Sequence, residues 1–291
     1  MKSILVTGAT GLIGSHLMRA IRENYTVFAI SRSKPVDGAA RTFAVDLARD
    51  WDAAALPERI DAVIHLAQSE HFRDFPSYAE EVFRVNTLST VKLFDYARTA
   101  GAKTFVLASS GGIYGTGDQS FSEETAVLAH GDLGFYLGTR LCSEVIAESY
   151  TEYINVVSLR FFFVYGPGQR PNMLIPRLVE SVRKRSTISV RGEQGLLINP
   201  IFVSDAVEAV RKALLLERSY KINVAGPEIL SLKAIVETIG AALRIKPAVR
   251  CEPCDKVQDL IGNTARMECL LCRPQVAFSS GLSAYLRSIG L

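Results

Sequence analysis

The sequence predicts an α/β fold: a Rossmann-type, doubly wound parallel sheet with a smaller C-terminal α+β lobe. Strand-like and helix-like segments alternate from residue 4 to residue 160, which is typical of parallel strands joined by helices. A glycine-rich turn separates the first strand from the first helix. Beyond residue 165 the strands become shorter and the alternation less regular, which indicates a second, smaller unit.

The first part of the chain supplies most of the predicted sheet. Short apolar runs predict strands, and apolar residues that recur every three or four positions predict helices. The predicted strands are 4–6, 26–30, 42–45, 62–66, 103–108 and 155–160, and the predicted helices are 11–24, 78–100 and 134–150. We assign residues 1–165 to a nucleotide-binding Rossmann domain on the grounds given below.

The second part of the chain begins with the turn signal Gly166-Pro167-Gly168. Further helices are predicted at 175–185, 205–217, 232–243 and 264–271, and further strands at 188–190, 201–203 and 221–224. Ser231 precedes one of these helices and is its expected N-cap. Segments near 200–225 are expected to rejoin the sheet, and residues 166–291 are expected to form mainly a substrate-binding lobe.

Composition excludes several classes of function. The chain has 291 residues, 48% of them hydrophobic, and a net charge of +3, so it can bury a sizeable core and shows no basic footprint for nucleic acid or an anionic membrane. No apolar run reaches the roughly 18 residues of a membrane span. The first apolar run is too short for a signal-peptide core. We therefore expect a cytoplasmic protein whose five cysteines are reduced.

The glycine turn predicts a dinucleotide site. Gly8, Gly11 and Gly14 follow the first strand and open a helix. The first glycine permits a tight turn, the second lets the backbone approach a pyrophosphate, and the third lets helix and strand pack closely. The neighbouring residues expected at the same site are Thr10, Leu12 and Ile13.

The end of the second strand selects the cofactor. An acidic residue at this place binds the adenosine ribose of NAD, whereas this chain has Ser31 and Arg32. A hydroxyl and a guanidinium suit a 2′-phosphate, so NADP is favoured over NAD. The alternative is that Arg32 stacks on adenine or lies in solvent. Asp46 and Leu47 follow the third strand and are expected to contact the adenine.

Three residues form a candidate catalytic group. Tyr136 and Arg140 are four residues apart on a predicted helix and therefore share one helix face. A free phenol has a pKa of about 10 and needs a nearby cation to exchange protons near neutrality. Ser110 follows a buried strand and is expected at its carboxyl end. The alternative is an ordinary surface pair of tyrosine and arginine.

Segments spread through nearly the whole chain carry a resemblance. They are 7–14, 46–47, 65–67, 85–86, 109–115, 136–140, 159–168, 201–205, 220–226 and 273–274. In this order they resemble extended short-chain dehydrogenases/reductases of the NAD(P)-dependent nucleotide-sugar epimerase and dehydratase group. The resemblance implies hydride transfer at a sugar carbon, with Tyr136 as acid/base, Ser110 orienting the oxygen and Arg140 tuning Tyr136. It also implies a homodimer built from the helices near 80–100 and 134–150.

The remaining site residues are expected at two places. His65 ends a strand beside the cofactor and is expected to be a packed core residue. Besides those already named, the expected cofactor-binding residues are Leu66, Ala67, Gln68, Asn86, Ala108, Ser109, Tyr136, Arg140 and Phe163. The expected substrate-binding residues are Ser69, Ser110, Gly111, Gly112, Tyr136, Arg170, Asn172 and Arg191.

The chain departs from the family pattern at several positions. Arg140 stands where the family has lysine, and a planar guanidinium cannot reproduce a compact ammonium. Phe163 stands where the family has an asparagine that touches the diphosphate, and Leu197 and Ile198 stand where it often has an arginine. These changes leave open a smaller, non-nucleotide carbonyl substrate, or a scaffold or redox sensor whose catalytic site has drifted.

The glycines after Ser110 bear on the reaction. Sugar-nucleotide 4,6-dehydratases carry an acidic pair there, so dehydration is not expected of this chain. Epimerisation and ketone reduction both remain open. Of the two, Arg32 slightly favours ketone reduction by an NADPH-dependent reductase.

Four of the five cysteines raise the question of a metal. Cys251 and Cys254 form one Cys-x-x-Cys pair, and Cys269 and Cys272 form another after 14 intervening residues. Four thiolates could hold a structural zinc ion. We favour packed thiols over zinc, because free cysteines are commonly buried, and we predict no metal site.

Overall fold

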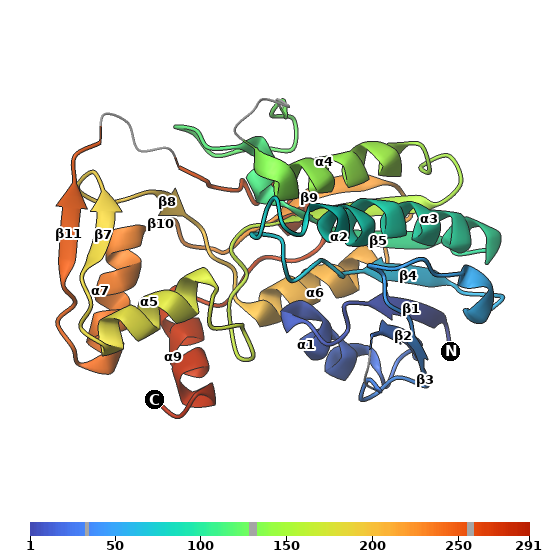
Figure 1. Ribbon diagram of the computed structural model, residues 1–291, viewed down its shortest axis with the longest axis horizontal. Coiled ribbons are helices and arrows are strands. Elements are labelled where there is room, and N and C mark those ends of the chain that lie inside the picture. The colour runs from blue at the N-terminus through green and yellow to red at the C-terminus, as the bar shows by residue number, and fades with distance from the viewer. Residues whose placement is uncertain (33–34, 128–132, 255–258) are drawn as a thin grey trace.

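The structure, a computed structural model, describes residues 1–32, 35–127, 133–254 and 259–291. Its centre is a seven-stranded sheet in the order β3-β2-β1-β4-β5-β6-β9, with every neighbouring pair parallel (Figure 1). The strands are β1 (Ser3–Thr7), β2 (Thr26–Ser31), β3 (Arg41–Ala44), β4 (Ala62–His65), β5 (Thr104–Ser110), β6 (Asn155–Phe161) and β9 (Tyr220–Val224). The predicted doubly wound, Rossmann-type sheet is confirmed.

Two helical layers cover the sheet because successive strand side chains point to opposite faces. On one face, Ile4 and Val6 of β1 share a buried cluster with α1 (Leu12–Ile21) and α6 (Val203–Ala213). On the other face, Leu5 packs with helix residues of 89–99 and 134–148. Every side chain of β4 is buried, as expected for a strand covered on both faces. The two layers leave the carboxyl edge of the sheet for a ligand.

The predicted long helix 78–100 changes its pitch midway. It consists of α2 (Ala79–Phe83), a π-helical turn (Arg84–Leu88) and α3 (Ser89–Thr99). The carbonyl oxygen of Asn86 accepts bonds from the hydroxyls of Thr90 and Ser143, both at 2.6 Å. Hydroxyls that compete for a helix carbonyl distort the regular ladder. Ser143 belongs to α4 (Gly134–Glu148), so the turn ties these neighbouring helices together.

A second lobe packs beside the sheet and has its own apolar cluster, which includes Tyr165, Ile175, Ile235 and Leu282 (Figure 1). Its elements are α5 (Leu174–Arg183), β7 (Ile188–Arg191), β8 (Leu197–Ile198), β10 (Leu230–Ser231), α7 (Leu232–Leu243), β11 (Val249–Glu252) and α9 (Phe278–Ser288). The pair β7–β11 is parallel and the pair β8–β10 antiparallel. The predicted N-cap of α7 is confirmed, since the Ser231 hydroxyl accepts from the Ala234 amide at 3.0 Å.

The predicted strand 201–203 is wrong. Val203 is already the first residue of α6, and Phe202 makes only an isolated bridge to Tyr165. Ile201 and Val203 are buried, so the apolar run reflects packing under the start of a helix. A short apolar run alone cannot separate these two structures.

The prediction of packed thiols is also wrong. Cys251, Cys254 and Cys269 are exposed, and Cys272 is only partly buried. Cys251 ends up in β11 of the second lobe, whereas Cys269 lies on α8 (Ala265–Leu270), which packs against β9 of the main sheet. The two pairs therefore belong to different parts of the fold.

Two findings concern the described residues as a set. Over 1–32, 35–127, 133–254 and 259–291, no group of three or more His, Cys, Asp or Glu side chains is arranged to hold a metal ion. Within the same ranges, no helix combines the length and the hydrophobicity needed to cross a bilayer.

Candidate active site

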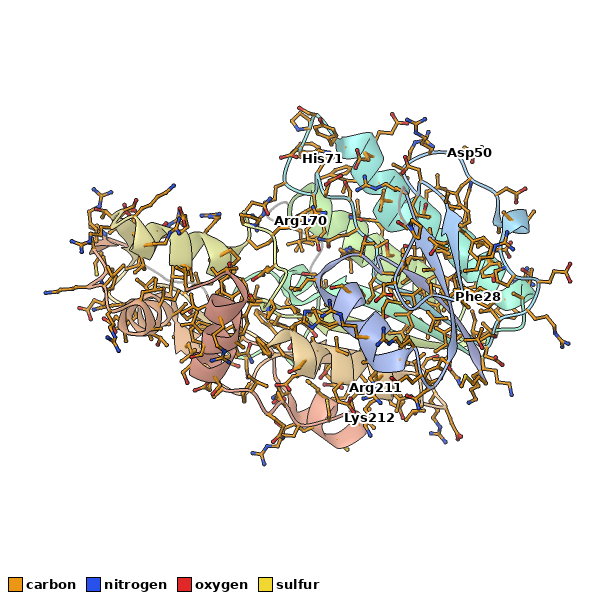
Figure 2. The ribbon with its side chains drawn as sticks, turned by 90° about the horizontal axis from the view of Figure 1, so that it is seen from below. Phe28, Asp50, His71, Arg170, Arg211 and Lys212 are labelled. Atoms are coloured by element: carbon orange, nitrogen blue, oxygen red, sulfur yellow. The ribbon has the colours of Figure 1, made fainter. Side chains whose placement is uncertain are left out.

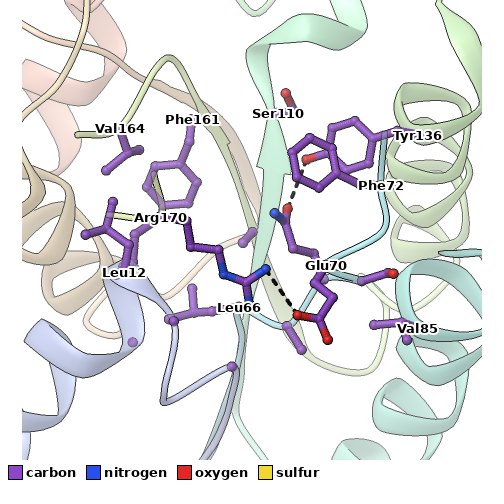
Figure 3. Close-up of a pocket in the computed structure, with 18 of the residues that line it drawn as sticks. Leu12, Leu66, Glu70, Phe72, Val85, Ser110, Tyr136, Phe161, Val164 and Arg170 are labelled. Atoms are coloured by element: carbon purple, nitrogen blue, oxygen red, sulfur yellow. Dashed lines mark hydrogen bonds and ion pairs between the residues drawn. The ribbon is translucent and has the colours of Figure 1, made fainter. Parts of the chain in front are cut away.

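The candidate site is a cavity of about 670 Å³ at the carboxyl edge of the sheet (Figure 3). It is lined by the turns that follow β1, β2, β4 and β5, by α4, and by the segment after β6. Parallel sheets bind ligands at this edge, where the strand order reverses. Here β1 is flanked by β2 on one side and by β4 on the other. The topology therefore opens the cavity over the glycine turn.

The glycine turn leaves no room for side chains. Gly8 has a φ of +69°, and a Cβ there would lie 2.7 Å from the amide nitrogen of Ala67. A Cβ on Gly14 would lie 2.1 Å from the carbonyl oxygen of Gly8. The turn therefore presents bare backbone beside the N-terminus of α1, which suits a pyrophosphate. These residues fit a bound dinucleotide.

Tyr136 and Arg140 meet at one atom of Gln68. The Tyr136 hydroxyl donates to Gln68 Oε1 at 3.1 Å, and Arg140 Nη2 donates to the same oxygen at 3.0 Å. The Arg140 guanidinium carbon lies 5.6 Å from the centre of the Tyr136 ring. Arginine can only donate, so the shared acceptor is the amide oxygen and the phenol is the second donor. Figure 3 shows Tyr136 turned into the cavity with this bond.

Arg140 is a buried cation, since only 2% of the residue is exposed. Its Nη1 donates to the carbonyl of Ala108 at 3.2 Å, and its Nη2 also lies 3.4 Å from the carbonyl of Ala67. Its Nε is buried and bonds to nothing in the described part of the chain. The guanidinium is thus held by carbonyl and amide oxygens at the ends of β4 and β5.

The expected core role of His65 is borne out by its complete burial. Its ring nitrogens lie 2.6 Å from the Thr7 hydroxyl and 2.9 Å from the Thr90 hydroxyl. Burial, together with the charge of Arg140, lowers the pKa of His65 from 6.5 to about 3. His65 is therefore neutral near pH 7 and supports the strand end from behind.

Ser110 is the last residue of β5, as predicted. Its Oγ accepts a hydrogen bond from the amide of Gly112 at 3.2 Å, and it lines the same cavity as Tyr136. Gly111 is required by packing, because a Cβ there would lie 2.3 Å from the Phe162 ring. A carboxylate could not stand at Gly111 without displacing that ring.

Most predicted site residues line the cavity. They are Gly8, Thr10, Gly11, Leu12, Ile13, Gly14, Ser31, Arg32, Asp46, Leu47, Leu66, Ala67, Gln68, Ser69, Ala108, Ser109, Ser110, Gly112, Tyr136, Arg140, Phe163 and Arg170. Their individual roles stay predictions.

Four predicted site residues are absent from the lining: Asn86, Gly111, Asn172 and Arg191. The fully buried Asn86 side chain accepts from the Ser69 amide and donates to the Thr139 hydroxyl, so it braces the site from behind. Asn172 offers its carbonyl oxygen to Arg73 at 2.9 Å. Arg191 is exposed on β7 in the second lobe.

Sequence reasoning placed Gln68 and Ser69 of the loop after β4 at the site but missed Glu70 and Phe72 of the same loop. Phe72 lines the cavity with its ring 4.9 Å from that of Tyr136. Glu70 also lines the cavity and meets Arg170, which lies at the junction of the two lobes (Figures 2 and 3). The loop has no hydrophobic period to mark it, and its position after a buried strand was the only available signal.

Known proteins identify the family. Residues 4–225 match the NAD dependent epimerase/dehydratase family. The chain belongs to this family. An uncharacterised UDP-glucose epimerase of Bacillus subtilis, YtcB, is 27% identical to this chain over 98% of both chains.

Two solved structures extend the comparison. MoeE5 in complex with UDP-glucuronic acid and NAD has a TM-score of 0.85 at 27% identity, over 99% of this chain and 98% of MoeE5. The UDP-glucuronic acid 4-epimerase from Bacillus cereus, in complex with NAD, has a TM-score of 0.85 at 25% identity, over 99% and 96% of the two chains. The predicted fold, the extended short-chain dehydrogenase/reductase family and the enzyme class are confirmed.

The prediction that NADP is favoured over NAD is wrong. The family is NAD dependent, and both solved structures contain NAD. The sequence interpretation treated Arg32 as a free cation. In the structure Arg32 Nη2 donates to Glu70 Oε1 at 2.9 Å, so its charge already faces a carboxylate.

Proposed function

We propose that this protein is an NAD-dependent nucleotide-sugar epimerase, with Tyr136 as its acid/base. The observation that carries the proposal is the joint bond of Tyr136 and Arg140 to Gln68 in a cavity built over a glycine turn. The similar proteins that act on UDP-sugars support the same substrate class.

The glycine turn, Tyr136, Arg140 and Ser110 have separate roles in the proposed reaction. The glycine turn would hold the pyrophosphate of NAD, which would supply a hydride acceptor when bound. Tyr136 removes a proton from a sugar hydroxyl and later returns it to the ketone. Arg140 places a positive charge beside the phenol, with its guanidinium carbon 5.6 Å from the centre of the Tyr136 ring. Ser110 orients the same sugar oxygen from the end of β5.

Two related reactions fit less well. A 4,6-dehydratase needs carboxylates after the serine, but the space at Gly111 is filled by the Phe162 ring. A net reductase gains from exchangeable NADPH, yet the arginine that suggested NADPH is paired with Glu70. Epimerisation needs neither feature, because the cofactor is restored in each cycle.

The test is a substrate panel read by proton NMR. Purified protein is incubated with NAD and, separately, UDP-glucose, UDP-glucuronic acid and dTDP-glucose, and the C4 epimer is quantified. Tyr136→Phe should lower turnover about 100-fold or more, the range expected for losing a general acid/base. Tyr153→Phe is the control, because Tyr153 is 66% exposed and lies outside the cavity.

One observation favours a second candidate, the reductase of a smaller carbonyl compound. Phe163 lines the cavity with Phe161 and Phe162, so apolar rings stand where the family contacts a diphosphate. Phe163 also has a φ of +45°, a conformation that asparagine tolerates better than a bulky residue. Micromolar binding of UDP by calorimetry would count against this candidate.

A third possibility is a cofactor-binding scaffold whose catalytic site has drifted, motivated by Arg140. Turnover by Tyr136→Phe equal to that of the wild type would support it, whereas a large loss excludes it. We also propose that the protein works as a homodimer through the layer formed by α2, α3 and α4, where Phe83 and Val145 are exposed.

A further inference from the structure

The pairing of Arg32 raises the question of what selects the cofactor. Arg32 stands at the end of β2, where an acidic residue commonly recognises the ribose hydroxyls of NAD. A free guanidinium there attracts the 2′-phosphate of NADP. The family nevertheless depends on NAD. Some other group must therefore oppose the effect of Arg32.

Glu70 is the group that meets Arg32. The Arg32 Nη2 and Glu70 Oε1 atoms are 2.9 Å apart, and the second oxygen, Oε2, lies 3.5 Å from Nη1 of Arg170. All three residues line the cavity. Figure 3 shows the Arg170 and Glu70 side chains reaching toward each other across it.

The sheet order explains how residues so distant in sequence meet. β2 and β4 are the two neighbours of β1, and the carboxyl ends of parallel strands lie at one edge. Arg32 follows β2, and Glu70 lies in the loop after β4, so their contact spans the turn that follows β1. A carboxylate from the β4 loop thus reaches the guanidinium of the residue that follows β2.

The Glu70 carboxylate is ionised near neutral pH. The hydrogen bond from Arg32, helped by the charges of Arg32, Arg170 and His71, lowers the pKa of Glu70 against the effect of burial. The Arg32 and Glu70 side chains are 57% and 36% exposed. Exposed ion pairs contribute little to the stability of the fold. The main effect of the Arg32–Glu70 pair is therefore on the local charge at the cavity.

We propose that Glu70 determines the preference for NAD by occupying the guanidinium of Arg32. A 2′-phosphate would have to displace the Glu70 carboxylate or lie beside it, and like charges at such short range are costly. The ribose hydroxyls of NAD are neutral and can donate to that carboxylate. Glu70 is therefore a specificity-determining residue supplied from outside the β2 segment.

The test compares binding of NAD and NADP by calorimetry, without any sugar substrate. Glu70→Gln keeps the shape and removes the charge. We expect the Kd for NADP to fall about tenfold or more, as for a gained hydrogen bond to a charged group, with a much smaller change for NAD. The gain should shrink as salt is raised, because it rests on charge.

A matched control separates this effect from a general loss of surface charge. Glu180→Gln removes a carboxylate that pairs with Arg183 and Lys184 on α5, outside the cavity. It should leave both Kd values unchanged. Thermal unfolding of each variant checks that the fold is kept.

A double variant tests whether Glu70 acts through Arg32. In Glu70→Gln combined with Arg32→Gln, the gain in NADP binding should disappear. An unchanged ratio of the two Kd values in Glu70→Gln, or a gain that survives in the double variant, would overturn the proposal. Because the readout is cofactor binding, these results stand whether or not the protein proves to be an epimerase.

Discussion

The substitution of arginine for lysine at position 140 can be judged from its contacts. The guanidinium spreads its donors over Ala108, Ala67 and Gln68, yet Nε is buried without a partner in the described chain. An unpaired buried donor costs about 1–3 kcal/mol. A lysine has no nitrogen equivalent to Nε, so it would avoid this unpaired donor. It would also keep the positive charge beside Tyr136.

We therefore predict that Arg140→Lys retains or raises the rate of epimerisation. Arg140→Met should lower it strongly, since the cation beside the phenol is lost. The measurement is the rate of C4 epimer formation by proton NMR for each variant, with circular dichroism to verify folding. Loss of activity in Arg140→Lys would mean that the planar guanidinium has a specific role that a point charge cannot fill.

His65 makes a residue-scale prediction about pH. The Thr90 hydroxyl gives its proton to the carbonyl of Asn86, so it accepts from Nε2 of His65, and Nδ1 is left to accept from Thr7. This neutral tautomer is fully paired. The folded pKa is about 3 and the ordinary value is 6.5, so between these pH values the unfolded chain binds the extra proton.

Stability contributed by neutral His65 is thus present above pH 6.5 and is lost progressively as the pH falls towards 3. The limiting slope is about 1.4 kcal/mol per pH unit for one proton. Urea unfolding at pH 5, 6 and 7 should give a shallower slope for His65→Gln than for wild type. Equal slopes in wild type and His65→Gln would contradict the prediction.

Among the elements, α4 matters most because it carries both Tyr136 and Arg140. A further turn along, Glu144 is 2% exposed and pairs with Arg160 of β6, which is 3% exposed, at 2.6 Å. Arg160 also donates to the Tyr114 hydroxyl at 2.5 Å. The pair fastens α4 to the sheet.

Removing one partner of a buried ion pair leaves the other charge buried and unpaired. We predict that Glu144→Gln lowers the free energy of unfolding by about 3–5 kcal/mol. Glu148→Gln, one turn further along α4, removes an exposed pair with Lys221 and should change it by less than about 1 kcal/mol. Urea denaturation curves give both values; similar losses in the two variants would show that Glu144 has no special anchoring role.

Element prediction was most accurate for one long periodic helix and failed for one apolar run of three residues. The helix 232–243 was predicted to the residue and its N-cap was correct. The strand 201–203 was wrong because an apolar run of three residues fits a buried helix start equally well. The π turn within 79–99 depends on hydroxyls from both α3 and α4, which no pattern within one helix can reveal.

At the scale of the molecule, the sequence predicted the parts of the site that local motifs define. The glycine turn, the end of β5 and the face of α4 all reach the same cavity. Glu70 and Phe72 in the loop after β4 were missed, and with Glu70 the correct cofactor, because their roles arise from contacts between distant segments. Exposed cysteines were misjudged for the same reason, since burial is a property of the assembled fold.

The outer helix layer leads to a last prediction, about assembly. Phe83 of α2, Leu88 of the π-helical turn and Val145 of α4 are 45%, 36% and 58% exposed on neighbouring helices. Apolar side chains gathered on one face are typical of a protein interface. Val145→Glu would place a charge in that face, and burying an unpaired charge is costly.

If these helices form a homodimer, Val145→Glu should shift the protein from dimer to monomer in sedimentation velocity experiments at micromolar concentration. Leu215→Glu is the control, because Leu215 is 60% exposed but follows α6 on the opposite face of the sheet. It should leave the dimer intact. A monomeric wild-type protein, or equal dissociation of both variants, would rule out this layer as the interface.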